Sequence, residues 1–117
     1  RIVLHEKTDI RDFELDRSPD IIVGDVSFIS LRDILPHVAK RLMGSATVLV
    51  AMVKPQFEAG RHLVQKGVVK NAAIRRKILT DFEQWAKQYF VVLDKKDSTV
   101  AGSKGNVERF YKLQLKK

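Results

Sequence analysis

The sequence has no cysteine, and this absence excludes disulfide bonds, thiol catalysis and cysteine-ligated zinc. A chain without cysteine fits a reducing compartment, so we expect a cytoplasmic protein. The three histidines, His5, His37 and His62, lack the spacing of metal ligands, and we predict no metal site. Long apolar runs are missing too: none approaches the roughly 18–20 residues that span a bilayer, and the start shows no signal-peptide pattern.

Basic residues are in clear excess. Lysine and arginine number 22 against 14 aspartates and glutamates, which gives a formal charge of +8. Such a surplus favours a polyanionic partner, either a nucleic acid or an acidic membrane face. A solvated basic surface without any partner accounts for the charge as well. At 117 residues with 44% hydrophobic content, the chain is long enough for one globular domain.

The apolar pattern predicts alternating strands and helices. The run at 20–25 is continuous rather than alternating, which predicts a strand buried on both faces. Ser30 is typical of a helix N-cap, with Asp33 completing a near capping box, although Pro36 lies past the first turn. The predicted strands are 2–5, 20–25, 47–53, 90–93 and 109–115, and the predicted helices are 31–43 and 72–89. This order predicts an α/β layer closed by an antiparallel hairpin.

One expected feature of such a sheet is not found. Open α/β sheets normally begin with a strand and a glycine-rich cofactor turn, and no such turn follows the first strand here. The glycine cluster at 101–106 precedes the last strand rather than a helix. The pattern therefore predicts the second half of a larger fold.

Three charged residues flank the ends of predicted strands. Asp25 ends the strand at 20–25, Lys54 ends the strand at 47–53, and Glu108 opens the last strand. If the last strand pairs antiparallel with 47–53, all three meet at one edge of the sheet, where open parallel sheets bind ligands. Pro55 stops the strand after Lys54, and residues 55–60 are predicted to form a polar turn. A surface ion network of little energetic value is the alternative interpretation.

Four motifs carry a family resemblance: DVSFISL at 25–31, VKPQFEAG at 53–60, KGVVKN at 66–71 and GSKGNVE at 102–108. Together they resemble the TlyA family, hemolysin-labelled proteins whose C-terminal domain resembles FtsJ-type ribosomal RNA 2′-O-methyltransferases. The resemblance implies a Rossmann-like fold that uses S-adenosylmethionine. It also implies that this chain is the C-terminal portion of that domain, without the S4-like RNA-binding domain and glycine loop, and inactive alone.

The resemblance also implies roles for single residues. Asp25, Lys54 and Glu108 match the Asp, the second Lys and the Glu of the family's Lys–Asp–Lys–Glu tetrad, whose first Lys lies upstream. Asp9 resembles the acid that contacts the cofactor's adenine, and Asp25 is assigned to the cofactor as well. The implied substrate is ribosomal RNA or a ribosomal subunit, methylated at a cytidine ribose. The basic residues placed to contact its phosphates are Arg61, Lys66 and Lys70, together with His62, Arg75 and Arg76. A solvated helix face explains Arg75 and Arg76 equally well.

The role of Lys54 has two interpretations. A neutral lysine can take the proton of the ribose hydroxyl, but a pKa near 7–8 lies about 3 units, or about 4 kcal/mol, below the usual 10.4. Asp25 and Glu108 favour the charged amine, which can orient the hydroxyl instead. We favour the base at this stage.

Two alternatives to an enzyme are open. The hemolysin label suggests a membrane-active protein, with helix 72–89 as its amphipathic segment, although we expect no stable membrane association. An RNA-binding or structural piece without catalysis is the other. A bare sheet edge in such a piece predicts either a rearranged N-terminus or a homodimer through that edge.

Overall fold

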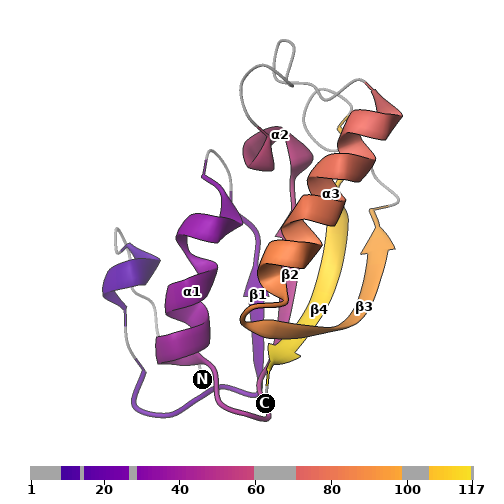
Figure 1. Ribbon diagram of the computed structural model, residues 1–117. Helices are drawn as coiled ribbons and strands as arrows, with labels where there is room; N and C mark the ends of the chain where they lie inside the picture. Colours follow the sequence, from indigo (N-terminus) through magenta and orange to yellow (C-terminus); the bar gives the residue numbers. More distant parts are fainter. Residues whose placement is uncertain (1–8, 14, 27–28, 60–70, 99–105, 117) are drawn as a thin grey trace.

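The computed structural model describes residues 9–13, 15–26, 29–59, 71–98 and 106–116. Its centre is a sheet of four strands in the order β1-β2-β4-β3 (Figure 1). β1 and β2 are parallel, whereas β4 runs antiparallel to both of its neighbours. The strands are β1 (Ile21–Gly24), β2 (Val48–Val53), β3 (Phe90–Asp97) and β4 (Arg109–Leu115). The predicted α/β layer with a closing antiparallel hairpin is confirmed. The predicted strand 2–5 and most of the glycine cluster lie outside the described residues.

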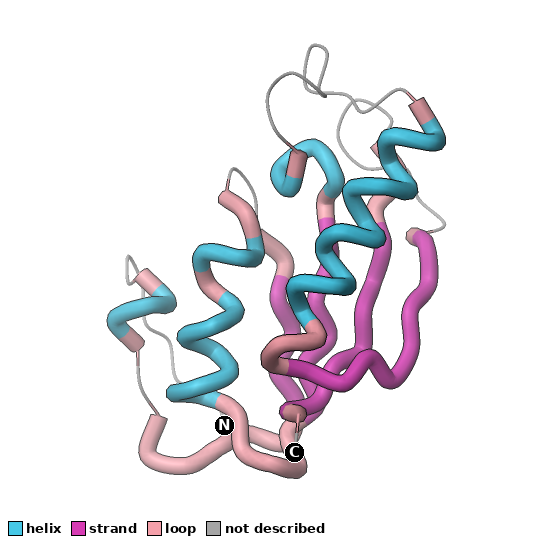
Figure 2. The backbone as a smooth tube through the Cα atoms, in the orientation of Figure 1, coloured by secondary structure: helices cyan, strands magenta, loops and turns pink. Residues whose placement is uncertain are grey.

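The helices cover one face of the sheet, as both views of the backbone show (Figures 1 and 2). α3 follows its N-cap Asn71, whose side-chain oxygen accepts hydrogen bonds from two backbone amides of the first turn. The helical segments are η1 (Ile10–Asp12), η2 (Leu31–Asp33), α1 (Leu35–His37), η3 (Val38–Leu42), α2 (Pro55–Glu58) and α3 (Ala72–Ala86).

The predicted helix 31–43 is not one regular α-helix, so that expectation is wrong in detail. The segment begins as the 3₁₀ turn η2, continues through the short α1 and ends as the π-helix η3. Pro36 lies in the middle and has no amide hydrogen to donate, which breaks the regular hydrogen-bond ladder. Beyond it, the amide of Met43 donates to the carbonyl of Val38, five residues back (3.0 Å).

The core lies between this helical layer and the sheet. Along β2 every second residue is buried, and Leu49, Ala51 and Val53 face the helices. From α3, Leu79 and Phe82 pack against them. The same alternation holds for β4, as the sequence predicts, with Tyr111 and Leu113 fully buried.

β1 differs from its prediction as a strand buried on both faces. Ile21 is 64% exposed and Val23 is 72% exposed. The reason is position: β1 is the terminal strand of the sheet that the described residues form, and the helices cover only one of its faces. Within the described residues the outer edge of β1 pairs with no strand, and the predicted homodimer through such an edge stays a prediction.

β3 is longer than the predicted 90–93. It continues to Asp97 as the partner of β4, with an irregularity in the pairing between Val92 and Asp94. The second half, Asp94 to Asp97, is charged and exposed. An apolar alternation cannot reveal such a segment, because its stability comes from ladder hydrogen bonds to β4 rather than from burial.

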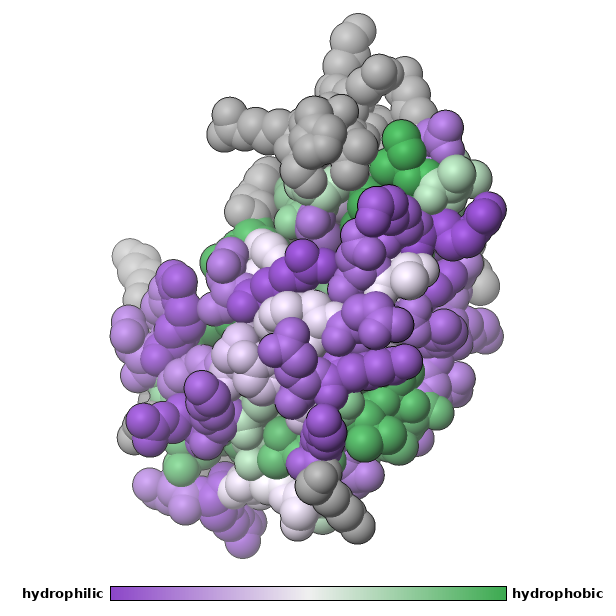
Figure 3. All heavy atoms as spheres, in the orientation of Figure 1, coloured by the Kyte–Doolittle hydropathy of each residue, from purple (hydrophilic) through white to green (hydrophobic). Residues whose placement is uncertain are grey.

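The outward surface of the helical layer is mainly hydrophilic (Figure 3). Within the described ranges, no helix combines the length and the apolar character needed to cross a bilayer. The apolar face of α3, with Ile78 and Phe82, is buried against the sheet. The face that a membrane-active helix would insert is therefore part of the core.

Candidate functional site

The ends of three strands bring the predicted site residues to one edge of the sheet. Asp25 follows β1, Lys54 follows β2, and Glu108 precedes β4. Val53 pairs with Arg109, so the next position of the same antiparallel pair places Lys54 opposite Glu108. The predicted convergence on one rim is present in the structure. What these residues do there remains a prediction.

Lys54 and Asp25 form an ion pair. The Nζ atom of Lys54 lies 2.6 Å from Oδ1 of Asp25. The Lys54 side chain is 13% exposed and that of Asp25 is 58% exposed. The Lys54 side chain is thus largely enclosed by protein, while that of Asp25 is open to solvent and so accessible to a ligand.

Glu108 is buried and held by a glutamine. The Nε2 atom of Gln56 donates to Oε2 of Glu108 at 3.3 Å. Ser98 fixes the backbone at the same point, because its amide donates to the carbonyl of Glu108 (2.8 Å). Sequence reasoning missed Gln56, although it lies inside the VKPQFEAG motif, two residues after Lys54. Its place in that motif was the available signal, since nothing local in the sequence connects it with Glu108.

The segment after Lys54 is a short helix rather than the predicted polar turn 55–60. Pro55 occupies the first position of α2, where its missing amide hydrogen costs nothing and its fixed φ suits the helix. The carbonyl of Lys54 accepts from the amide of Phe57 (2.9 Å), and that of Pro55 accepts from Ala59 (3.0 Å). Lys54 is therefore fixed at the point where strand becomes helix.

Glu58 at the end of α2 reaches the loop that follows β1. Its Oε1 accepts from Ser30 Oγ (2.6 Å) and its Oε2 accepts from the amide of Leu31 (2.8 Å). The Ser30 N-cap is confirmed, since its hydroxyl also accepts from the amide of Arg32. The carboxylate at this helix start comes from Glu58, not from the predicted Asp33. Burial raises the pKa of Glu58 above its usual value, against the opposing effect of its hydrogen bonds.

Asp9 caps a short helix instead of joining the rim contacts. Its carboxylate accepts from the backbone amide of Arg11 and from both Nε and Nη2 of the guanidinium (2.9, 3.0 and 2.7 Å). These hydrogen bonds lower its pKa to about 2. Local capping therefore accounts for Asp9, and its assignment to a cofactor stays a prediction.

The predicted phosphate contacts Arg61, His62, Lys66 and Lys70 lie outside the described residues. Arg75 and Arg76, also predicted to contact phosphate, are described at the start of α3, and Arg75 makes structural contacts. Arg75 donates to the carbonyl of Val107 (3.0 Å) and to Oδ1 of Asp97 (2.8 Å). Arg109 donates to the same oxygen at 2.8 Å. The two arginines thereby anchor the end of β3 beside the start of β4, next to Glu108.

Replacing Asp97 with asparagine is expected to lower stability at neutral pH by roughly 1 kcal/mol, because its partly exposed ion pairs with Arg75 and Arg109 are lost. The hydrogen bonds from Arg109 and Arg75 lower the pKa of Asp97. A lowered folded-state pKa stabilises the protein at pH values above the unfolded-state pKa, and this stability is lost as the pH falls through the folded-state pKa.

Urea unfolding of the wild type and of Asp97→Asn at neutral and acidic pH measures the difference in their unfolding free energies, which should shrink in acid. Asp81→Asn, which breaks one exposed pair with Lys77, is the control. A difference that does not change with pH would contradict the assignment.

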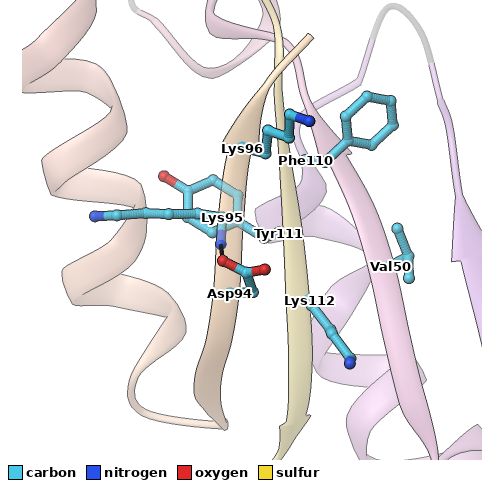
Figure 4. Close-up of a pocket in the computed structure, with 7 residues that line it drawn as sticks. All are labelled: Val50, Asp94, Lys95, Lys96, Phe110, Tyr111 and Lys112. Atoms are coloured by element: carbon cyan, nitrogen blue, oxygen red, sulfur yellow. Dashed lines mark hydrogen bonds between the residues drawn. The ribbon is translucent and has the colours of Figure 1, made fainter.

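Among the hollows that the described residues form, two bear on the location of the site. One of about 210 Å³ lies between β1 and α1, where mostly apolar side chains and Asp25 line it. The other is a shallow hollow on β2, β3 and β4, in which Lys96 lies beside Phe110 and Lys112 lies further along β4 (Figure 4). The second contains none of the three rim residues. The first adjoins the site through Asp25.

Comparison with known proteins adds a family. A family model described as FtsJ-like methyltransferase matches residues 1–115. The 23S rRNA (cytidine-2′-O)-methyltransferase TlyA of Campylobacter jejuni is 36% identical over 114 residues, covering 95% of this chain and 44% of the relative. Hemolysin A of Brachyspira hyodysenteriae is 38% identical over 95 residues, covering 80% of this chain and 39% of the relative. The chain thus spans less than half the length of these relatives.

A solved structure matches the fold closely. A Lactococcus lactis protein, named as a hemolysin, superimposes with a TM-score of 0.89 at 32% identity. The match covers 97% of this chain and 57% of that protein. The fold expected from the motifs agrees with this similarity over nearly all of the chain.

Proposed function

This chain belongs to the FtsJ-like methyltransferase family, and from that premise we propose that it is the C-terminal part of a ribosomal RNA 2′-O-methyltransferase domain. Membership of the family implies a methyl donor, which we propose to be S-adenosylmethionine. The substrate class, a cytidine ribose of ribosomal RNA, is taken from the TlyA relative. The observation that carries the proposal is the ion pair of Lys54 and Asp25 beside Glu108 at the rim of the sheet.

The charged amine of Lys54 suits a role in orienting the ribose hydroxyl. A hydroxyl is a poor nucleophile and needs to be held in line with the methyl carbon it attacks. The ion pair with Asp25 at 2.6 Å fixes the amine at the rim of the sheet, so we propose the orienting role here in place of the base that the sequence analysis favoured. We assign Lys54 the task of donating a hydrogen bond to the 2′-oxygen and stabilising negative charge that develops on it. In the transfer the oxygen–carbon bond forms, the carbon–sulfur bond breaks, and the hydroxyl proton leaves to water or to the exposed Asp25 carboxylate.

The described residues offer a partial fit for the methyl donor. S-adenosylmethionine supplies a methyl group on positively charged sulfur and carries an adenosine. A carboxylate that is 58% exposed suits such a cation, and the apolar hollow beside Asp25 suits an adenosine. We propose that Asp25 faces the donor, and that Asp9 contributes from the start of η1. Arg61, Lys66 and Lys70 are proposed to bind RNA phosphates, which the net charge of +8 supports.

The proposal is tested by assaying ribose methylation with purified ribosomal RNA and isotopically labelled S-adenosylmethionine. A longer protein that adds the upstream part of the domain to this chain is expected to transfer label to a 2′-oxygen, detected as resistance of that linkage to alkali. The 117-residue chain alone is expected to transfer none. Label on a base instead of a ribose, or release of dye from anionic liposomes without methylation, would contradict the proposed activity.

A further inference from the structure

The loops that carry Asp25 and Lys54 are joined by a second contact, distant from the ion pair itself. Glu58 lies four residues after Lys54 and binds Ser30 and Leu31, which follow Asp25 by five and six residues. Two contacts therefore join the segment after β1 to the segment after β2. One is the ion pair of Lys54 with Asp25, and the other is the binding of Glu58 to Ser30 and Leu31. Each loop is therefore held to the other at two points.

The hydrogen bonds of Glu58 to Ser30 and Leu31, called the clamp from here on, lie in the protein interior. The side chain of Glu58 is 1% exposed, and both carboxylate oxygens accept a hydrogen bond shorter than 3 Å. The Arg32 guanidinium, whose Nε lies 4.0 Å from Oε1, provides a compensating charge. Hydrogen bonds to a buried carboxylate are among the stronger ones in proteins, because the acceptor is charged. A surface glutamate would not supply a comparable restraint.

The clamp acts on Lys54 through a short, hydrogen-bonded backbone. Between Lys54 and Glu58 the chain makes a single helical turn, closed by Phe57 N–H to the Lys54 carbonyl (2.9 Å). Pro55 fixes φ at the start of this turn and is buried. A shift of Glu58 away from Ser30 therefore moves the backbone that carries the Lys54 amine.

We propose that Glu58 is a positioning residue that holds the α2 turn against the loop after β1 and thereby sets the distance between Lys54 and Asp25. The inference rests on the proposed function for its catalytic consequence, but its geometric claim is independent of that function. Both carboxylate oxygens of Glu58 are bound by Ser30 and Leu31, so it acts on Lys54 through the backbone of α2 rather than on the substrate.

The first test measures the exposure of Lys54 directly, without any methylation assay. An amine-labelling reagent is applied to the folded chain, and mass spectrometry compares labelling of Lys54 with that of Lys77, which is 73% exposed. Glu58→Ala is expected to raise the Lys54-to-Lys77 ratio about tenfold, since charge-assisted hydrogen bonds of the clamp are lost. Glu58→Gln is expected to stay within about twofold of wild type, because an amide can accept from Leu31 N–H and donate to Ser30 Oγ.

Matched variants separate positioning from general destabilisation. Glu83→Ala removes another largely buried glutamate, on α3, whose Oε1 lies 2.8 Å from Nζ of Lys95 on β3. This variant should leave the labelling of Lys54 unchanged. Ser30→Ala removes one donor of the clamp and should raise the ratio about threefold. It tests the proposal even if Glu58→Ala does not fold. Unchanged labelling in folded Glu58→Ala and Ser30→Ala, or an equal rise in Glu83→Ala, would overturn it.

The second test asks for the catalytic consequence in the longer protein. Glu58→Ala is expected to lower kcat for RNA methylation about tenfold or more with KM for RNA changed less than about twofold, and Glu58→Gln is expected to restore kcat. Loss of RNA binding instead of kcat would overturn the positioning role. If no variant methylates RNA but the labelling pattern holds, the proposed function fails and the clamp stands.

Discussion

Replacing Lys54 with alanine is expected to lower kcat for ribose methylation by about 10²–10³-fold, the usual cost of removing one donor that stabilises a developing charge. RNA affinity should change little, because a single lysine at the rim is a small part of the phosphate-binding charge. The fold should survive, since Asp25 is 58% exposed and water can replace its lost partner. Single-turnover rates at saturating RNA measure the effect without interference from product release.

Two further substitutions decide how Lys54 acts. Lys54→Met keeps the buried stem but has no charge, and it should be as slow as Lys54→Ala. Lys54→Arg keeps a charge that cannot be removed at ordinary pH, and it should retain activity within roughly tenfold if the amine orients the hydroxyl. If Lys54 is instead the base, Lys54→Arg would be as slow as Lys54→Ala, and the wild-type kcat would rise with pH as the lysine loses its proton.

The meeting of Asp25, Lys54 and Glu108 could be predicted because it depends on strand order alone. Each residue is a covalent neighbour of a strand end, and one antiparallel pairing brings the three ends to the same edge. Apolar runs locate such strands, and the residue after a run is fixed by the sequence. The motif resemblance then implied a catalytic role for the three residues.

The contacts that hold the trio in place could not be predicted in this way. Glu58 is separated from Ser30 by 28 residues and Gln56 from Glu108 by 52, so no local pattern connects either pair. Their partners become visible only when α2 and the loop after β1 are folded against each other. The prediction that β1 is buried on both faces was wrong for a related reason. An apolar run shows that a strand favours burial, but it does not show which other elements cover its faces.

Truncating Phe82 to alanine is expected to cost about 3–5 kcal/mol, a large part of the roughly 5–15 kcal/mol that stabilises a typical domain. Phe82 is fully buried at the centre of the interface between α3 and the sheet. Its ring lies 5.5 Å from that of Tyr111 and 5.8 Å from that of Trp85, measured between centroids. Neighbouring backbone cannot readily fill the space, because both sides belong to regular elements.

Urea unfolding monitored by Trp85, the single tryptophan of the chain, measures this loss. Phe110→Ala is the matched control: it removes the same side chain from the same sheet at a position that is 36% exposed, and should cost about 1 kcal/mol or less. The pKa of Tyr111 gives a local reading, since burial raises it to about 12. If water enters the space left by Phe82, that pKa falls toward its ordinary value, which absorbance titration of the phenol detects. A Phe82→Ala variant as stable as Phe110→Ala would mean that α3 does not pack on β4 as described.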